Sequence, residues 1–374
     1  MIRLLHIADV HLGASYSAFG ELAGARAAEV RRAFRDLPRT AEREEADLVL
    51  IAGDLFDRPD LPSQLVAEAR ETIRRTVEAG HPVLLVPGNH DALSLSGSPY
   101  RLPLGGAHLF SEPRFGEPVT VETENGVVNV YGIAHDLASE PEPLATFRRA
   151  DRPGWHVVML HGSVPDAPHW RPSPNALRLP PADLASLGAD YIALGDYHRP
   201  RMPDEFEGAP ACYPGSFAAL DLTETGPRGY VVVELGDEGV RIQHRSSGVQ
   251  EVVDVGELDV SDCGNEVEVV ESIAARLPPE GRPIPTARLV GEPQFPLNAA
   301  VVTEEARARF GYARIVDDTR YFSSNRLDEI AGQDTVAGHV ARLGRERVRA
   351  AGSDADRMAA ERALRIVLSA MEVR

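Results

Sequence analysis

With 374 residues, 43% hydrophobic and 26% charged, the chain is long enough for two or three globular domains, and its composition excludes a disordered or fibrous protein. No run approaches the roughly 20 apolar residues of a membrane span, and Asp9 comes too early for the apolar core of a signal peptide, so we expect a cytoplasmic protein. The formal net charge of −18 argues against non-specific coating of DNA, although a local DNA site stays open because bound divalent metals bring positive charge.

Residues 1–235 alternate between short apolar runs and amphipathic stretches. The apolar runs are rich in Val, Ile and Leu and predict buried strands at 2–8, 48–52, 83–86, 128–133, 157–160 and 191–194. Helices are predicted at 29–44 and 63–79, where apolar residues recur at three- and four-residue spacings. This alternation predicts an α/β domain in which helices cover the sheets.

The texture of the sequence changes after this domain. Strands are predicted at 229–235, 240–244, 251–255 and 287–290 and a helix at 267–277, which indicates a small α+β module. Further on, Asp334 and either Ser353 or Asp354 are candidate N-caps of two amphipathic helices. We therefore predict three regions, an α/β domain at 1–238, a capping domain at 239–300 and a helical C-terminal region at 301–374.

Polar clusters follow five of the predicted strands. In chain order they are Asp9 and His11; Gly53, Asp54 and Asp57; Gly88, Asn89, His90 and Asp91; His161; and Gly195, Asp196 and His198. Ligands bind beyond the carboxyl ends of strands in open α/β sheets, so these side chains are expected to meet. Oxygen ligands mixed with imidazoles suit Mn, Fe or Zn, and their number exceeds the needs of one ion. The pattern predicts a two-metal site for displacement at phosphorus.

The order of these motifs resembles the calcineurin-like metallophosphoesterase superfamily, whose pattern is DxH, GDxxD, GNHD or GNHE, a lone His, and GHxH. Within it the chain is similar to the SbcD-type double-strand-break repair nucleases, through DVHLG at 9–13, AGDLFD at 52–57, YPGS at 213–216 and RGYVVVE at 228–234. The resemblance implies a sandwich of two sheets flanked by helices, followed by a capping domain and a helical tail.

The resemblance also implies a role for each site residue. One metal would take Asp9, His11 and His198, the other would take Asn89, His161 and Asp196, and Asp54 would bridge them. His90 would protonate the leaving sugar oxygen or stabilise the pentacoordinate phosphorus, and Asp57 would orient His90, unless Asp57 is a helix N-cap. Arg58 would contact phosphate or lie on the surface. One position departs from the family pattern, because Asp196 stands where GHxH has its first His; it either binds the second metal as a carboxylate or turns away.

The leading interpretation is a metal-dependent DNA nuclease, an exonuclease or endonuclease, that acts in double-strand-break repair with two divalent ions. Mn²⁺ is the first choice, and Mg²⁺ or Fe²⁺ are alternatives. The resemblance implies an SbcC-like coiled-coil ATPase partner that docks on the helical tail. The apolar stripes of the tail either supply that contact or pack on their own domain. We also expect a homodimer, associated with the nucleoid. Two alternatives stay open: a phosphatase or phosphodiesterase for a non-DNA ester, favoured by the net charge, and a weakly active scaffold, favoured by Asp196.

Overall fold

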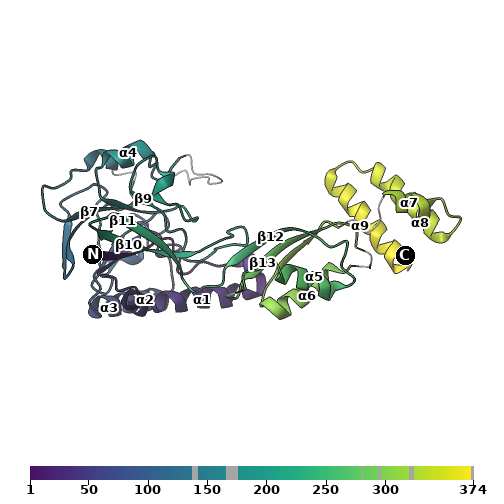
Figure 1. Ribbon diagram of the computed structural model, residues 1–374, viewed down its shortest axis with the longest axis horizontal. Helices are drawn as coiled ribbons and strands as arrows, with labels where there is room; N and C mark the ends of the chain where they lie inside the picture. Colours follow the sequence, from purple (N-terminus) through teal and green to yellow (C-terminus); the bar gives the residue numbers. More distant parts are fainter. Residues whose placement is uncertain are drawn as a thin grey trace. The chain divides into compact units, whose positions relative to one another are not determined.

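The computed structural model describes residues 1–136, 142–165, 176–279, 281–293, 295, 297–319 and 324–371. Contacts divide the chain into two compact units, Met1–Val252 and Val253–Arg374. The first unit contains two sheets and the second unit contains a third (Figure 1).

The first sheet has the strand order β11-β10-β1-β2-β3-β4. Its strands are β1 (Ile2–Ile7), β2 (Leu48–Ala52), β3 (Val83–Val86), β4 (His108–Leu109), β10 (Gly229–Gly236) and β11 (Gly239–Ser246). The predicted strands at 2–8, 48–52 and 83–86 are confirmed, and they run parallel at the centre of this sheet. Because they are parallel, the loops that follow them leave from the same edge.

The second sheet has the order β5-β6-β7-β8-β9. Its strands are β5 (Val119–Thr123), β6 (Gly126–Gly132), β7 (Trp155–His161), β8 (Tyr191–Gly195) and β9 (Ala211–Cys212). Strands β6 to β9 are parallel, and His161 at the end of β7 pairs with Gly195 at the end of β8. The segments that carry the predicted residues His161, Asp196 and His198 therefore emerge side by side.

The two sheets pack face to face around one apolar core. This core takes Leu4, Leu50 and Val86 from the first sheet and Val130, Met159 and Tyr191 from the second. Helices α1 (Ala23–Arg35), α2 (Leu37–Arg43) and α3 (Ser63–Glu78) lie on one side of the sandwich and α4 (Pro181–Ser186) on the other (Figure 1). The sandwich of two sheets flanked by helices that the sequence predicts is confirmed.

The helix predicted at 29–44 is two helices in the structure. The break falls at Asp36, and α2 begins with Pro38 in its first turn. Proline is tolerated there but not inside a helix, because it lacks an N–H and its ring clashes with the preceding turn. The described part of this unit also contains short 3-10 helices, η1 (Ser17–Leu22), η2 (Pro99–Arg101), η3 (Pro143–Thr146) and η4 (Pro203–Glu205).

The second unit begins with a three-stranded sheet of order β12-β13-β14, made of Val252–Asp259, Ile284–Val290 and Arg314–Asp317. Helices α5 (Glu266–Ala274) and α6 (Ala299–Phe310) pack with it around Val269, Leu289 and Val302. This core extends past residue 300. At the other end, β11 pairs with β10 through a tight turn at Gly236 and Gly239, so the predicted boundary at 238/239 falls inside a hairpin of the first unit.

The C-terminal region contains α7 (Ser324–Ala331), α8 (Val336–Arg349) and α9 (Asp354–Ala370). The hydroxyl of Thr335, not the neighbouring Asp334, caps α8 by accepting the N–H of Gly338 at 3.1 Å. The hydroxyl of Ser353 accepts the N–H of Asp356 in the first turn of α9, also at 3.1 Å. The helices bury a small core of their own, formed by Ile330, Ala337, Ala341, Leu364 and Leu368. The division into a capping domain and a helical region stays a prediction.

Candidate metal centre

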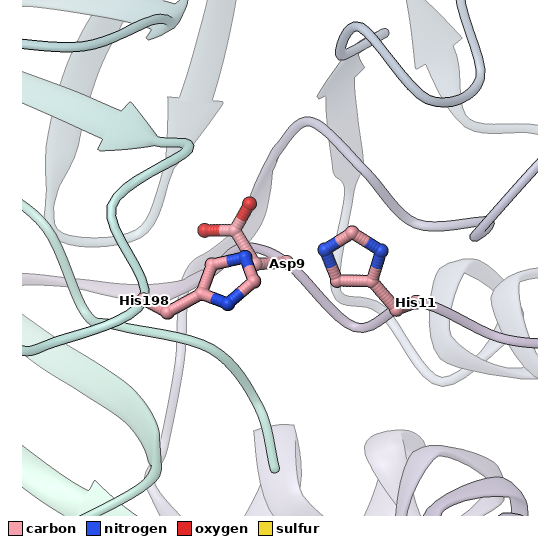
Figure 2. A group of neighbouring side chains, drawn as sticks. All are labelled: Asp9, His11 and His198. Carbon is pink, nitrogen blue, oxygen red and sulfur yellow. The ribbon is translucent and has the colours of Figure 1, made fainter. Parts of the chain in front are cut away.

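The first cluster of the site is formed by Asp9, His11 and His198. Each offers a ligand atom, and these atoms all lie within 4.8 Å of one another. Figure 2 shows Asp9 and His11 on one loop and His198 on another segment. Asp9 and His11 are buried and His198 is half-buried, so the cluster is open on the His198 side.

A second cluster surrounds His161 at the end of β7. Its Nδ1–H donates to the carbonyl of Ala52 at 3.0 Å, which leaves Nε2 facing inward. Nε2 lies 3.0 Å from Oδ1 of Asn89, 3.4 Å from Oδ2 of Asp54 and 3.8 Å from Oδ1 of Asp196. One nitrogen surrounded by three oxygens needs a positive charge among them, either a proton or a metal ion.

The loops that carry these residues have strained backbones. Asp9 and His11 have φ 50°, Asp54 has φ 48° and Asp196 has φ 104°. Such values cost non-glycine residues about 1–3 kcal/mol each, although Asp and His tolerate them best. Main-chain hydrogen bonds hold the loops in place, from the Asp9 N–H to the carbonyl of Gly53 and from the His11 N–H to the carbonyl of Asp54. Strain concentrated at one edge of the sheets is typical of a functional site.

Three glycines allow the close approach of these loops. A Cβ at Gly53 would lie 2.1 Å from Nδ1 of His161, and one at Gly195 would lie 1.9 Å from the carbonyl oxygen of Ala52. A Cβ at Gly88 would lie 2.0 Å from Oδ1 of Asp54. None of these distances is possible for a real side chain, so the glycines of the polar clusters are required by space.

The charges of the site are strongly coupled. Burial raises the pKa of Asp9 to about 6, although His161 and His198 act in the opposite direction. Burial opposes ionisation of Asp54 too, but the imidazoles of His161 and His11 prevail and hold the pKa of Asp54 well below its usual value. For His161 burial disfavours the proton, yet Asp54 and Asp9 raise its pKa well above normal. Positive charge is thus favoured at this position.

The residues fit divalent metal ions. Both ring nitrogens of His11 are buried and have no hydrogen-bond partner within the part of the chain that the structure describes. An unsatisfied buried imidazole is costly, and coordination of a metal by Nε2 removes that cost. Carboxylates, an amide oxygen and imidazoles form a donor set for Mn, Fe or Zn.

His90 and Asp57 meet, but through a different atom than expected. The Nδ1–H of His90 donates to the main-chain carbonyl of Asp57 at 2.8 Å. The Asp57 carboxylate instead lies 3.4 Å from Nδ1 of His11. Both His90 and the neighbouring Arg58 are exposed. His90 is therefore oriented by the backbone of residue 57, and the side chain of Asp57 belongs to the surroundings of His11.

Two residues support the site from outside the proposed ligand set: Glu224, which the sequence does not single out, and Asp91, which belongs to the motif at 88–91 but had no predicted role. Glu224 accepts the Nδ1–H of His198 at 2.7 Å and the N–H of Leu220 at 2.9 Å. No pattern around residue 224 signals this role, because only the tertiary fold brings it to His198. Asp91 accepts the N–H groups of Gly88 and Phe56 and joins two of the site loops. Its place in the motif at 88–91 was a usable signal.

Replacing Glu224 with glutamine is expected to weaken metal binding at the His198 position by about 10–100-fold, the usual effect of losing a carboxylate that holds a ligand histidine. Burial lowers the pKa of His198, but its hydrogen bond to Glu224 prevails and raises it to about 9. Without that negative charge the pKa of His198 should fall. Calorimetric titration with Mn²⁺ measures the first effect and NMR titration of the metal-free protein the second. The exposed Glu122→Gln is the control; equal affinities in Glu224→Gln and wild type would contradict the role.

Comparisons with known proteins identify the class. The family model for calcineurin-like phosphoesterases matches residues 2–200. The chain is 26% identical over 338 residues to the uncharacterized metallophosphoesterase YhaO of Bacillus subtilis, covering 88% of this chain and 81% of that protein. It is 30% identical over 342 residues to the DNA double-strand break repair protein Mre11 of Aeropyrum pernix, covering 84% and 79%. It is 33% identical over 244 residues to the Mre11 of Archaeoglobus fulgidus, covering 60% and 52%.

The chain therefore belongs to the calcineurin-like phosphoesterase family. Membership makes it a hydrolase of phosphate esters that uses divalent metal ions, and the side-chain clusters described above supply candidate ligands. Its similarity to the Mre11 proteins is distant. In the described residues no helix combines the length and apolarity needed to cross a membrane.

Proposed function

We propose that this protein is a metal-dependent nuclease that hydrolyses DNA phosphodiester bonds in double-strand-break repair, the SbcD-type activity expected from its motifs. The observation that supports this most is the position of Oδ2 of Asp54, 3.8 Å from Nε2 of His11 and 3.4 Å from Nε2 of His161. One carboxylate oxygen thus faces both clusters, as the bridging ligand of a two-metal site must. DNA is the proposed substrate because the Mre11 relatives are DNA double-strand break repair proteins.

In this proposal Asp54 would serve both ions, and the other ligands would divide between them. One ion would be held by Asp9, His11 and His198, the other by Asn89, His161 and Asp196. When bound, the pair supplies Lewis acidity that activates water and neutralises the charge developing on the phosphate. Three carboxylates favour Mn²⁺ or Mg²⁺, with Fe²⁺ as an alternative.

The remaining residues position and protonate the substrate. The main-chain N–H of His90 donates to Oδ1 of Asp54 at 3.0 Å and leaves Oδ2 for the metals. Because the Nδ1–H of His90 is engaged by the carbonyl of Asp57, the doubly protonated ring would give its Nε2 proton to the leaving oxygen and become the neutral Nδ1–H tautomer. Arg58, the residue after Asp57, is exposed. Its guanidinium would contact a neighbouring phosphate of the DNA.

The test is a comparison of substrates. Purified protein is incubated with linear duplex DNA, supercoiled plasmid, bis-p-nitrophenyl phosphate and p-nitrophenyl phosphate, with Mn²⁺, Mg²⁺, Fe²⁺ or EDTA. We expect metal-dependent cleavage of DNA and of the diester, strongest with Mn²⁺. Hydrolysis of the monoester alone would refute the nuclease and support the phosphatase, which the net charge of −18 favours. Two bound ions with no hydrolysis of any substrate would support a scaffold.

The helical tail is the proposed docking surface for a coiled-coil ATPase. Its own core leaves apolar side chains exposed, with Val336 at 73%, Leu343 at 52% and Val367 at 44%. A groove of about 710 Å³ between α8 and α9 is lined by Leu343, Arg347 and Val367 together with several alanines. The exposed apolar residues and the arginine suit an amphipathic helix with acidic flanks. The expected homodimer stays a prediction, which light scattering would measure.

Leu343→Asp is expected to reduce ATPase binding by at least about tenfold, because it places a charge in an apolar interface. Hydrolysis of bis-p-nitrophenyl phosphate should not change, since residue 343 belongs to the second unit and the site to the first. Pull-down with the coiled-coil ATPase of the same organism measures binding. Val267→Asp, at an equally exposed apolar residue of α5, is the matched control. Undiminished binding by Leu343→Asp would remove α8 from the interface.

A further inference from the structure

Asp196 occupies the position at which the family motif has a histidine, and its surroundings are specific. The main-chain N–H of Asp196 donates to both carboxylate oxygens of Asp9 at 3.1 Å. The residue is 6% exposed and has φ 104°, a backbone conformation that side chains rarely adopt. A buried, strained aspartate persists only where its surroundings hold it firmly.

The side chain that holds Asp196 is Ser163. Its hydroxyl donates to Oδ2 of Asp196. The backbone of Ser163 is fixed on both sides, because its N–H donates to the carbonyl of Leu177 at 2.7 Å and its carbonyl accepts the N–H of Leu179 at 2.8 Å. The hydroxyl is therefore presented from a rigid segment.

The two residues meet because of the strand register. His161 pairs with Gly195 across the parallel strands β7 and β8, so the chains that follow leave the sheet together. Two residues beyond His161 comes Ser163, and one residue beyond Gly195 comes Asp196. The register therefore places the hydroxyl of Ser163, just after β7, next to the carboxylate of Asp196, just after β8.

An imidazole presents a single nitrogen in a fixed direction, whereas a free carboxylate can rotate and offer either oxygen. With Oδ2 engaged by Ser163, the carboxylate is held in the orientation in which Oδ1 lies 3.8 Å from Nε2 of His161. We infer that Ser163 is a positioning residue, which fixes the Asp196 carboxylate so that Oδ1 takes the place of the histidine nitrogen at the second metal position. This inference rests on the proposed two-metal site and adds a residue to it.

The competing explanation is that Ser163 only satisfies a buried carboxylate. A purely structural hydrogen bond would affect unfolding and leave the affinities for metal unchanged. A positioning hydrogen bond affects one metal ion selectively, since in the proposed ligand set Ser163 orients a ligand of the second ion, whereas Asp9, His11 and His198 hold the first. Metal binding in the absence of substrate separates the two explanations.

The experiment titrates the metal-free protein with Mn²⁺ alone and follows binding by calorimetry and by the EPR signal of free Mn²⁺. Ser163→Ala is expected to weaken one of two Mn²⁺ sites by about 10–100-fold and to leave the other within about threefold, as for other losses of a group that orients a ligand. Ser163→Thr keeps the hydroxyl and should restore the affinity. Ser186→Ala, at an exposed serine of α4, is the control for a serine substitution. Unfolding temperatures of all variants are measured in parallel.

A double-substitution cycle makes the test sharper. In an Asp196→His background the imidazole needs no hydroxyl to select its ligand atom, so adding Ser163→Ala should cause no further loss of Mn²⁺ affinity. Equal losses from Ser163→Ala in both backgrounds, or a lowered unfolding temperature with both affinities intact, would overturn the inference. Its failure is distinct from that of the proposed function: a protein that binds two ions, responds to Ser163→Ala at one and cleaves no DNA supports the inference and refutes the nuclease. If Ser163→Ala binds two Mn²⁺ ions as tightly as wild type and wild type cleaves DNA, the inference is refuted and the nuclease is supported.

Discussion

Replacing His90 with alanine is expected to reduce phosphodiester hydrolysis by about 10²–10⁴-fold, the usual effect of removing a general acid, while the protein keeps its metal ions. The reason lies in which atoms of His90 are engaged. Its contact with Asp54 is made by the main-chain N–H, which alanine retains. The ring bonds the carbonyl of Asp57 and the residue is exposed, so its loss removes a proton donor and none of the proposed ligands.

Metal content per chain and initial rates, measured on the same preparations, check this expectation. His81→Ala is the matched control. The Nδ1 of His81 also bonds a main-chain carbonyl, that of Ala46 at 2.7 Å. Residue 81 precedes β3, however, whereas His90 follows that strand on the side of the site. If metal content falls with activity in His90→Ala, the ring is a ligand and the assignment of His90 as an acid is wrong.

The sandwich and the location of the site were predictable because they depend on local patterns. Buried strands need continuous apolar runs, and five of the six runs predicted in the α/β domain end in a polar cluster. Parallel strands carry their ends to one edge, so the meeting of Asp9, Asp54 and His161 follows from strand direction. The glycines at 53, 88 and 195 carried the same information, since the loops can approach so closely only without a Cβ.

Other features depend on contacts between distant segments, which no local pattern records. Glu224 lies 26 positions after His198 in the sequence, beyond η4 and β9, and only the tertiary fold brings the two side chains together. Strand β11 alternates between exposed and half-exposed residues, and its place in the first unit comes from pairing with β10 and from contacts of Val240 and Ile242 with the sandwich core. The bond between Ser163 and Asp196 likewise arises from the register of two strands. A departure from a family motif can therefore be seen in the sequence, whereas the residue that accompanies it emerges only from the fold.

Gly88→Ala is expected to lower hydrolysis by at least about 100-fold, because displacement of a catalytic group by about 1 Å has effects of that size. The new Cβ would lie 2.0 Å from Oδ1 and 2.7 Å from the main-chain nitrogen of Asp54. Asp54 cannot simply move aside, since its Oδ1 accepts the N–H of His90 and its carbonyl accepts the N–H of His11. A shift of Asp54 disturbs the one carboxylate proposed to contact both ions, so Mn²⁺ binding should weaken at both positions. This distinguishes Gly88→Ala from Ser163→Ala, which should affect only one.

The matched control is Gly116→Ala, at an exposed glycine of the same unit where a new Cβ meets nothing within 4 Å. It should retain wild-type rates and metal content. Overpacking at Gly88 also costs stability, about 1–3 kcal/mol, so circular dichroism at the assay temperature must show that Gly88→Ala is folded before its rate is interpreted. A folded Gly88→Ala protein with wild-type rate and two tightly bound Mn²⁺ ions would mean that Asp54 is free to relax. In that case neither the close contact of the two loops nor the exact position of Asp54 would be required for hydrolysis.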